Sequence, residues 1–126
     1  MRVIKFRGFN RKNNEWLQGF YLQNRGAHFV CPDEFATNKS WEDYEVDPDT
    51  VGQFTSLKDK DGHEIYEGDI LGVGEEKEWL EVRFVRGVFA FLWNGNLDDE
   101  FPCNAPTHEW AKVIGNIHDD QEIMKK

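Results

Sequence analysis

The chain has 126 residues, of which 14% are aromatic, and its formal net charge at pH 7 is −9. This length suits one domain or two very small ones that share a core, and the aromatic content argues against a largely disordered chain. No apolar run approaches the roughly 20 residues that a membrane span needs, and the first residues form no apolar signal core, so we expect a cytoplasmic protein with no membrane partner.

The first part of the chain shows the alternation of apolar and polar residues that is typical of strands. Near its start, Ile4 and Phe6 fall on one face of a strand and Lys5 falls on the other. On this pattern, strands are expected at 3–9, 16–22 and 27–31. The segment 32–50 is irregular and acidic, and it closes with a turn at 47–50.

The later part contains more and shorter strand segments, with glycine turns between them. Strands are expected at 51–57, 63–66, 70–73, 79–84, 88–93 and 113–117. The Asp61-Gly62 pair supplies one of the turns, because it accepts the positive φ that tight hairpins need. A short helix is permitted near 103–112, and residues 119–126 have the pattern of a frayed tail.

Short strands at close spacing predict a mainly β fold, built as a small barrel or a pair of twisted sheets. A seam near residue 50 divides the chain. We therefore predict an N-terminal β subdomain over 1–50 and a C-terminal β subdomain over 51–126, and we leave open whether the two share one core.

Three separate runs of the chain resemble the signature of the YopX family of phage and prophage proteins. The central run is Gln53–Ile70, the opening run is Ile4–Arg7, and the closing run is Val113–His118. The resemblance implies a β-rich fold whose later part is similar to an SH3-like barrel, in a protein encoded by a phage or prophage and active in its bacterial host cell. It implies no catalytic or ligand-binding residues. If members of the family differ in function, the stretches 23–50 and 94–110, which match none of these runs, are where the difference is expected.

Aromatic residues are the first set of candidate functional side chains. Five tryptophans exceed what a small core fully encloses, so some rings are expected at the surface. The candidates for a partner-binding groove are Trp41, Tyr44, Trp79, Trp93, Phe101 and Trp110. An aromatic patch with an acidic rim suits a basic peptide or protein. The alternative is that these rings belong to the core or to contacts within a homo-oligomer.

The first twelve residues form a basic segment in an otherwise acidic chain. They hold five cations and no acid, a local charge of +5. Among these cations, Arg2, Lys5 and Arg7 are candidates for contacting nucleic acid, although the net charge of the whole chain disfavours general phosphate binding. The alternative is a solvated strand edge that lysine and arginine protect against aggregation.

Histidine and cysteine form a third and weaker candidate set. His28 and Cys31 are three residues apart, and Cys103 and His108 are five apart. Together they suit tetrahedral zinc if the two segments meet in space. The spacing differs from the usual Cys-x-x-Cys knuckle, so buried thiols and surface imidazoles are the alternative, and no cofactor is expected.

Other sequence features that suggest chemistry have simpler explanations. The run Asp59-Lys60-Asp61-Gly62 lacks the register of a calcium loop and is expected to be a surface turn. The carboxylates of Glu67 and Asp69 flank Gly68 in a second turn. No serine lies in a nucleophile elbow. The sequence therefore predicts a non-enzymatic protein that binds another protein or itself, and nucleic-acid or zinc binding are the alternatives.

Overall fold

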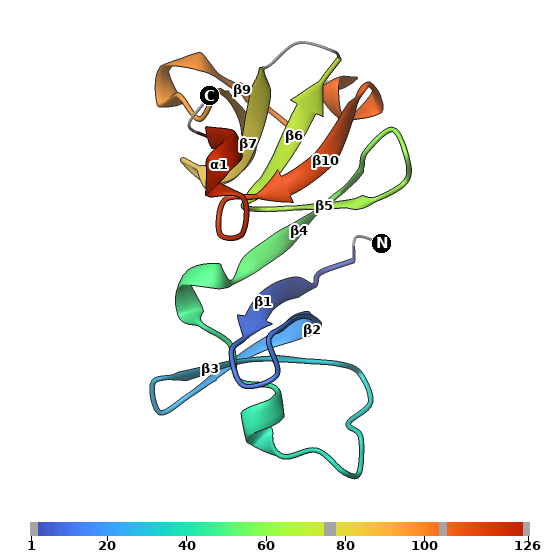
Figure 1. Ribbon diagram of the computed structural model, residues 1–126, viewed down its shortest axis with the longest axis vertical. Coiled ribbons are helices and arrows are strands. Elements are labelled where there is room, and N and C mark those ends of the chain that lie inside the picture. The colour runs from blue at the N-terminus through green and yellow to red at the C-terminus, as the bar shows by residue number, and fades with distance from the viewer. Residues whose placement is uncertain (1–2, 75–77, 104–105, 125–126) are drawn as a thin grey trace. The chain divides into compact units, whose positions relative to one another are not determined.

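The computed structural model describes residues 3–74, 78–103 and 106–124, and the protein is mainly β, as the sequence predicted (Figure 1). The strands of this described part form two antiparallel five-stranded sheets, in the orders β3-β2-β1-β4-β5 and β10-β6-β7-β8-β9. No helix among the described residues is long and apolar enough to cross a membrane. The second sheet is open in this strand order, and the SH3-like barrel stays a prediction.

The chain divides into two compact units, Met1–Phe54 and Thr55–Lys126, which we call the N-terminal and the C-terminal unit. The division falls inside strand β4 (Gly52–Lys58), just after the predicted seam at residue 50. The predicted division into an N-terminal and a C-terminal β subdomain stays a prediction, and so does the alternative that the two share one core.

The N-terminal unit is built on a three-stranded meander of β1 (Phe6–Asn10), β2 (Glu15–Asn24) and β3 (Ala27–Cys31). The first residues of β4 pair with the outer edge of β1. One glycine sets the spacing of β2 and β3, because a Cβ on Gly19 would lie 1.9 Å from the carbonyl oxygen of Cys31. Any larger residue at this position would force the two strands apart.

The acidic segment 32–50 folds back along the outer edge of β3, and it is irregular apart from two short 3-10 helices. These are η1 (Trp41–Asp43) and η2 (Pro48–Thr50). The Val30 N–H donates to the Tyr44 carbonyl at 3.0 Å, and the Val46 N–H donates to the His28 carbonyl at 2.8 Å. The strand edge is therefore covered, which removes a site for edge-to-edge aggregation.

Asn10 fastens this segment to the sheet from inside the N-terminal unit. Its side chain is buried, and its amide donates to the carbonyl oxygens of Glu42 at 3.1 Å and Glu45 at 2.7 Å. The N–H of Asn13 donates to the Asn10 side-chain oxygen at 2.7 Å. A single buried amide thus fixes the position of the segment that contains η1.

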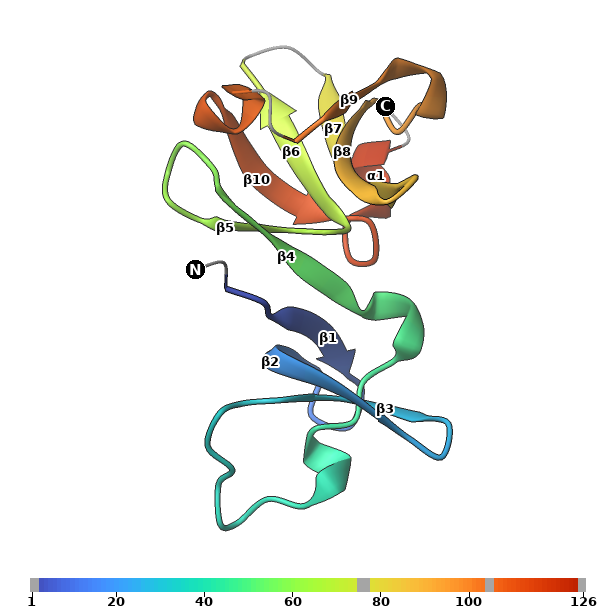
Figure 2. The same ribbon diagram turned by 180° about the vertical axis from the view of Figure 1, so that it is seen from behind.

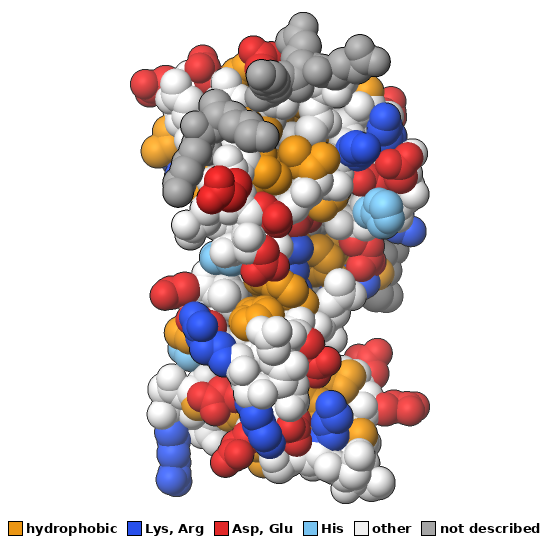
Figure 3. Space-filling model, viewed as in Figure 1, with side chains coloured by type: hydrophobic (Ala, Val, Ile, Leu, Met, Phe, Trp, Pro, Cys, Tyr) orange, Lys and Arg blue, Asp and Glu red, His pale blue; other side chains and the backbone are white. Residues whose placement is uncertain are grey.

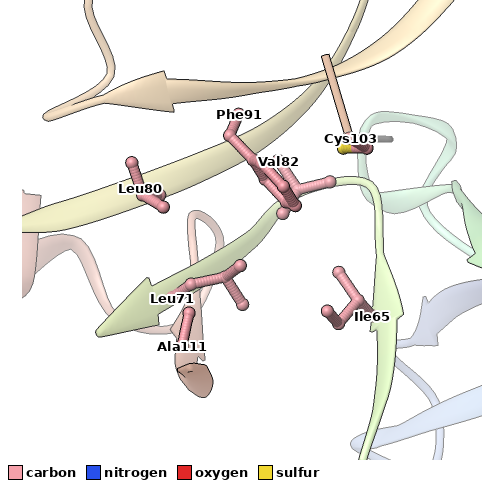
Figure 4. Close-up of a cluster of buried hydrophobic side chains, with 7 residues drawn as sticks. All are labelled: Ile65, Leu71, Leu80, Val82, Phe91, Cys103 and Ala111. Atoms are coloured by element: carbon pink, nitrogen blue, oxygen red, sulfur yellow. The ribbon is translucent and has the colours of Figure 1, made fainter. Parts of the chain in front are cut away.

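The C-terminal unit contains the second sheet and a compact apolar core. Its elements are β5 (Glu64–Tyr66), β6 (Asp69–Val73), β7 (Trp79–Val85), β8 (Val88–Trp93), η3 (Leu97–Asp99), β9 (Glu100–Pro102), η4 (Pro106–Glu109), β10 (Ala111–Asn116) and α1 (Gln121–Met124). Strand β8 is seen in the view from behind (Figure 2). Figure 4 shows seven buried core side chains, Ile65, Leu71, Leu80, Val82, Phe91, Cys103 and Ala111. They come from segments that are far apart in the sequence, which makes the core a property of the whole unit.

A buried carboxylate joins the turn after β4 to the outer edge of β10. The side chain of Asp59 accepts hydrogen bonds from the N–H groups of Asp61 at 2.9 Å and His63 at 2.8 Å through one oxygen. Its other oxygen accepts from the Val113 N–H at 2.8 Å. The central and closing runs that carry the family resemblance therefore meet at Asp59.

Three local features differ from the expectations. Strand β9 was missed, because three residues ending in proline show no alternation. The helix expected near 103–112 is the single 3-10 turn η4, and the C-terminal tail contains the short helix α1. The Asp120 carboxylate precedes α1 and accepts from the Asn116 N–H at 3.0 Å, so local hydrogen bonds order a segment that lacks an apolar periodicity.

Candidate partner-binding surface

Five aromatic side chains of the N-terminal unit form a contiguous group that we call the aromatic cluster. Its members are Phe20, Phe29, Phe35, Trp41 and Tyr44. Phe35 is the centre, with ring centroids 5.1 Å from Tyr44, 5.6 Å from Trp41 and 6.4 Å from Phe20. Trp41 also packs on Phe29 at 5.5 Å. These edge-to-face contacts make the rings one surface.

Two strands and the acidic segment supply the five rings. Phe20 comes from β2 and Phe29 from β3, while the other three rings come from residues 35–44. Tyr44 is buried, and its hydroxyl accepts from the Ala36 N–H at 3.2 Å, which ties the loop that carries Phe35 to the end of η1. The Asp43 carboxylate accepts from the Ser40 N–H at 2.9 Å and closes the turn that presents Trp41.

Three rings of the cluster remain open to solvent although they pack on one another. Trp41 is 56% exposed, Phe35 is 49% exposed and Phe20 is 43% exposed. Burying a large apolar side chain completely contributes about 1.5–3 kcal/mol, so a half-exposed ring leaves about 1 kcal/mol unused. Neighbouring exposed rings on one surface are the usual mark of a binding site.

Trp41 lies between two hollows in the surface of the N-terminal unit. One hollow has a volume of about 240 Å³ and is lined by Phe35, Lys39, Ser40, Trp41 and Tyr44. The other has a volume of about 500 Å³ and is lined by Leu22, Gln23, Asn24, Phe29 and Trp41. A partner side chain in either hollow would contact the indole of Trp41.

The acidic residues near the cluster differ in whether they already have a cationic partner. Lys12 binds Asp43 at 3.0 Å, and Arg11 pairs with Asp47. The Ser40 N–H, the Asn13 amide and Lys12 together hold the pKa of Asp43 well below its ordinary value. Asp33 and Glu34, by contrast, are exposed and form no ion pair within the described part of the chain.

The six aromatic residues predicted to form one groove divide between the two units. Trp41 and Tyr44 belong to the aromatic cluster, whereas Trp79, Trp93, Phe101 and Trp110 lie in the C-terminal unit. There, Trp79 is buried, Trp93 and Phe101 pack against the core, and Trp110 is exposed. Phe20, Phe29 and Phe35 were not among the site residues predicted from the sequence. The nearest signal was the position of Phe35 and Trp41 in a segment outside the family runs.

The basic N-terminal segment is largely engaged within its own unit. The Lys5 ammonium lies 5.1 Å from the ring centre of Phe54, and the Arg7 guanidinium lies 5.0 Å from that of Trp16. The other predicted contact residue, Arg2, lies outside the described residues. On the face that Figure 3 presents, lysine and arginine side chains are interspersed with acids and form no single basic patch. The geometry gives the nucleic-acid prediction little support.

The four predicted zinc ligands are also divided, with His28 and Cys31 in one unit and Cys103 and His108 in the other. Residues three apart on a strand point to opposite faces, so β3 directs His28 and Cys31 away from each other. No group of three potential ligands within the described ranges includes any of these four side chains. Zinc binding stays a prediction that the geometry does not support.

Neither cysteine has the setting of a reactive nucleophile. Both thiols are free and buried. Burial raises the pKa of Cys31, and it raises the pKa of Cys103 to about 12. Since the thiolate is the reactive form, both side chains are expected to be inert near neutral pH.

Asp59, Asp61 and His63 are the potential metal ligands that do lie close together among the described residues. Burial raises the pKa of Asp59, but the backbone hydrogen bonds from Val113, His63 and Asp61 outweigh it, so the pKa lies below its ordinary value. A cation at Asp59 would have to compete with these three hydrogen bonds. The three hydrogen bonds give the turn a structural role around the buried Asp59, and the expected absence of a calcium site stays a prediction.

Nearly the whole chain is similar to known proteins. A family model described as YopX protein matches residues 5–125. The crystal structure of protein EF1440 from Enterococcus faecalis is similar, with a TM-score of 0.60 and 25% sequence identity, over 98% of this chain and 99% of that one. No curated protein sequence matches this chain.

Proposed function

The chain belongs to the YopX family, and from this premise we propose that it is a non-enzymatic binding module that holds a protein partner on its aromatic cluster. The partner-binding residues in this proposal are Phe20, Phe35 and Trp41. Phe29 packs on Trp41 and Tyr44 packs on Phe35, and these contacts hold the two exposed rings in place. The C-terminal unit serves as a separately packed body with its own core.

The observation that carries the proposal is the exposure of Phe35 and of the two rings that pack on it, Phe20 and Trp41, with two hollows beside Trp41. Aromatic side chains are enriched where proteins bind each other, because they bury much area for little loss of conformational entropy. Phe35 and Trp41 also sit in the segment 23–50, outside the runs that resemble the family signature. This position suits a surface that differs between members while the rest of the fold stays alike.

The non-enzymatic part of the proposal draws its support from the candidate reactive groups. Burial raises the pKa of both thiols. The buried carboxylate of Asp59 already accepts three backbone hydrogen bonds. Groups with these roles stabilise a fold, and none of them is poised for proton transfer or nucleophilic attack.

A capture experiment with matched variants tests the proposal. The tagged chain, its Trp41→Ala variant and its Phe84→Ala variant are each incubated with nuclease-treated bacterial lysate, and the retained proteins are identified by mass spectrometry. Phe84 is the control, because it is a 50% exposed phenylalanine in the C-terminal unit. We expect a protein retained by the wild type and Phe84→Ala to be lost from Trp41→Ala.

Retention of the same proteins by all three chains would show that the aromatic cluster does not hold the partner. Circular dichroism of each variant confirms that the fold is kept. The identity of the retained protein also tests the phage or prophage setting that the family resemblance implies. The wild-type chain can also be incubated with lysate that has not been treated with nuclease. If it then retains nucleic acid, and a variant with neutral residues in place of Lys5 and Arg7 does not, the nucleic-acid alternative is supported instead.

A further inference from the structure

The acidic segment that carries the aromatic cluster has more charge than its ion pairs neutralise. Residues 32–47 contain six acids and one lysine, Lys39. Arg11 and Lys12 engage three of the acids, Glu42, Asp43 and Asp47. Asp33 and Glu34 precede Phe35 directly and have no ion pair within the described residues. Two exposed acids without an ion pair therefore adjoin Phe35 in the sequence, and the one lysine of the segment, Lys39, lines the smaller hollow.

This charge selects among the possible occupants of the surface. The segment 32–47 has a local formal charge of −5, so a nucleic acid, an acidic protein or the same segment of a second copy would meet repulsion at the cluster. A positively charged segment would meet attraction, which increases at low ionic strength. Charge complementarity thus favours a basic partner over the other classes.

The indole of Trp41 supplies the second element of recognition. Tryptophan is the best aromatic acceptor of a lysine or arginine cation, and the attraction acts within about 6 Å of the ring centre. The N-terminal unit already uses this geometry twice, in the Lys5–Phe54 and Arg7–Trp16 contacts. Trp41 lines both hollows, so it is accessible from more than one side.

We propose that the aromatic cluster binds a basic segment of a partner protein, with a lysine or arginine of the partner stacked on Trp41. Apolar side chains of the same segment occupy the two hollows, and Asp33 and Glu34 attract its remaining cations. This inference rests on the proposed function and adds the chemical class of the partner to it.

Three synthetic fluorescent peptides of equal length test the inference. Each alternates leucine with one polar residue, which is arginine in the first peptide, glutamate in the second and glutamine in the third. Binding to the full chain is followed by fluorescence anisotropy at low and high salt. We expect the arginine peptide to bind at least about tenfold more tightly than the other two at low salt, and to lose most of this advantage at high salt.

Two pairs of variants locate the interaction. Trp41→Ala is expected to weaken binding of the arginine peptide about tenfold, whereas Phe84→Ala leaves it unchanged. The double variant Asp33→Asn/Glu34→Gln is expected to weaken it severalfold. Its control is Asp98→Asn/Asp99→Asn, which removes the same charge from two exposed acids of the C-terminal unit. If both double variants weaken binding equally, the preference for the arginine peptide comes from the net charge of the chain. That result would overturn the assignment of the interaction to Asp33 and Glu34.

The other outcomes separate this inference from the proposed function. Equal binding of all three peptides, or a preference for the glutamate or glutamine peptide, would overturn the basic-segment inference and leave a binding surface of different specificity. If no peptide binds but lysate capture still depends on Trp41, the inference also fails while the proposed function stands. Concentration-dependent dimerisation that Phe35→Ala abolishes, measured by analytical ultracentrifugation, would assign the surface to a second copy of the chain.

Discussion

Two groups of packed aromatic rings, one in each unit of this protein, differ in their exposure to solvent. In the C-terminal unit, Trp79 and Phe91 are buried, and Phe101 packs against the same core. In the N-terminal unit, Trp41 and Phe35 pack on each other and remain half exposed. Aromatic content alone therefore does not distinguish a ring that stabilises the fold from a ring that is available to a partner. The difference lies in whether a second layer covers the ring.

A comparison of two phenylalanine substitutions sharpens this contrast and should give the largest effect. Phe91→Ala removes a fully buried ring, so we expect the C-terminal unit to lose about 3–5 kcal/mol of its free energy of unfolding. Phe35→Ala removes a half-exposed ring and should cost about 1 kcal/mol. Urea unfolding followed by tryptophan fluorescence measures both changes. Equal losses would mean that Phe35 is as much a core residue as Phe91.

A second prediction concerns the buried carboxylate at the turn of the C-terminal unit. Asp59→Asn keeps one oxygen for the N–H groups of Asp61 and His63, but it turns an amide donor toward the Val113 N–H. We expect a loss of about 1–3 kcal/mol in the free energy of unfolding, because a hydrogen bond is replaced by two facing donors. Asp61→Asn is the matched control, because Asp61 is exposed, and it should change stability by less than about 0.5 kcal/mol.

The same carboxylate predicts how stability depends on pH. The folded-state pKa of Asp59 lies below its ordinary value of 3.8, so the folded protein favours the ionised form. The resulting stabilisation is complete above the pKa of the unfolded chain, and it is lost as the pH falls through the lower folded-state pKa. Denaturation midpoints between pH 7 and pH 2 should decline less in Asp59→Asn than in the wild type. Parallel declines would assign the acid sensitivity to other carboxylates.

A more local effect connects the fold of the N-terminal unit to its surface. Asn10→Ala removes the buried amide that donates to the carbonyls of Glu42 and Glu45. We expect a loss of about 1–3 kcal/mol, confined to the segment that carries Trp41, because two carbonyls lose a donor. Hydrogen exchange at residues 41–46 should accelerate while exchange in β7 and β8 stays unchanged. A uniform acceleration would show that the two units unfold together.

Sequence patterns predicted much of the fold, because strands bury alternate residues and glycine or proline marks their ends. Strand β3 was predicted with the bounds that the structure has, and β7 and β8 each differ by a residue or less at either end. Patterns fail where local hydrogen bonds, and not periodicity, order the chain. The turn at Ser40 and Asp43 and the short strand β9 are of this kind.

The candidate surface was only partly predictable for a different reason. Trp41 and Tyr44 were named from residue type, but so were Trp79 and Trp93, which the structure assigns to the packing of the C-terminal unit. The exposure of a ring depends on which neighbouring element covers it, and the pattern of residues along one sequence does not reveal that element. Phe20 illustrates the point, since its position in β2 shows an ordinary strand pattern and only the tertiary structure leaves its ring uncovered.

The contact between Asp59 and the edge of β10 has a consequence for the order of events during synthesis. Strands β1 to β3 and their partner β4 are complete once residue 58 has been made, so the N-terminal unit has all its pairing partners early. Strand β6 must wait for residues 111–116, because β10 covers its outer edge. On a ribosome that adds about 5–20 residues per second, the unpaired edge of β6 is exposed for seconds. The nascent C-terminal unit is then the part of this protein with the greatest need of a chaperone.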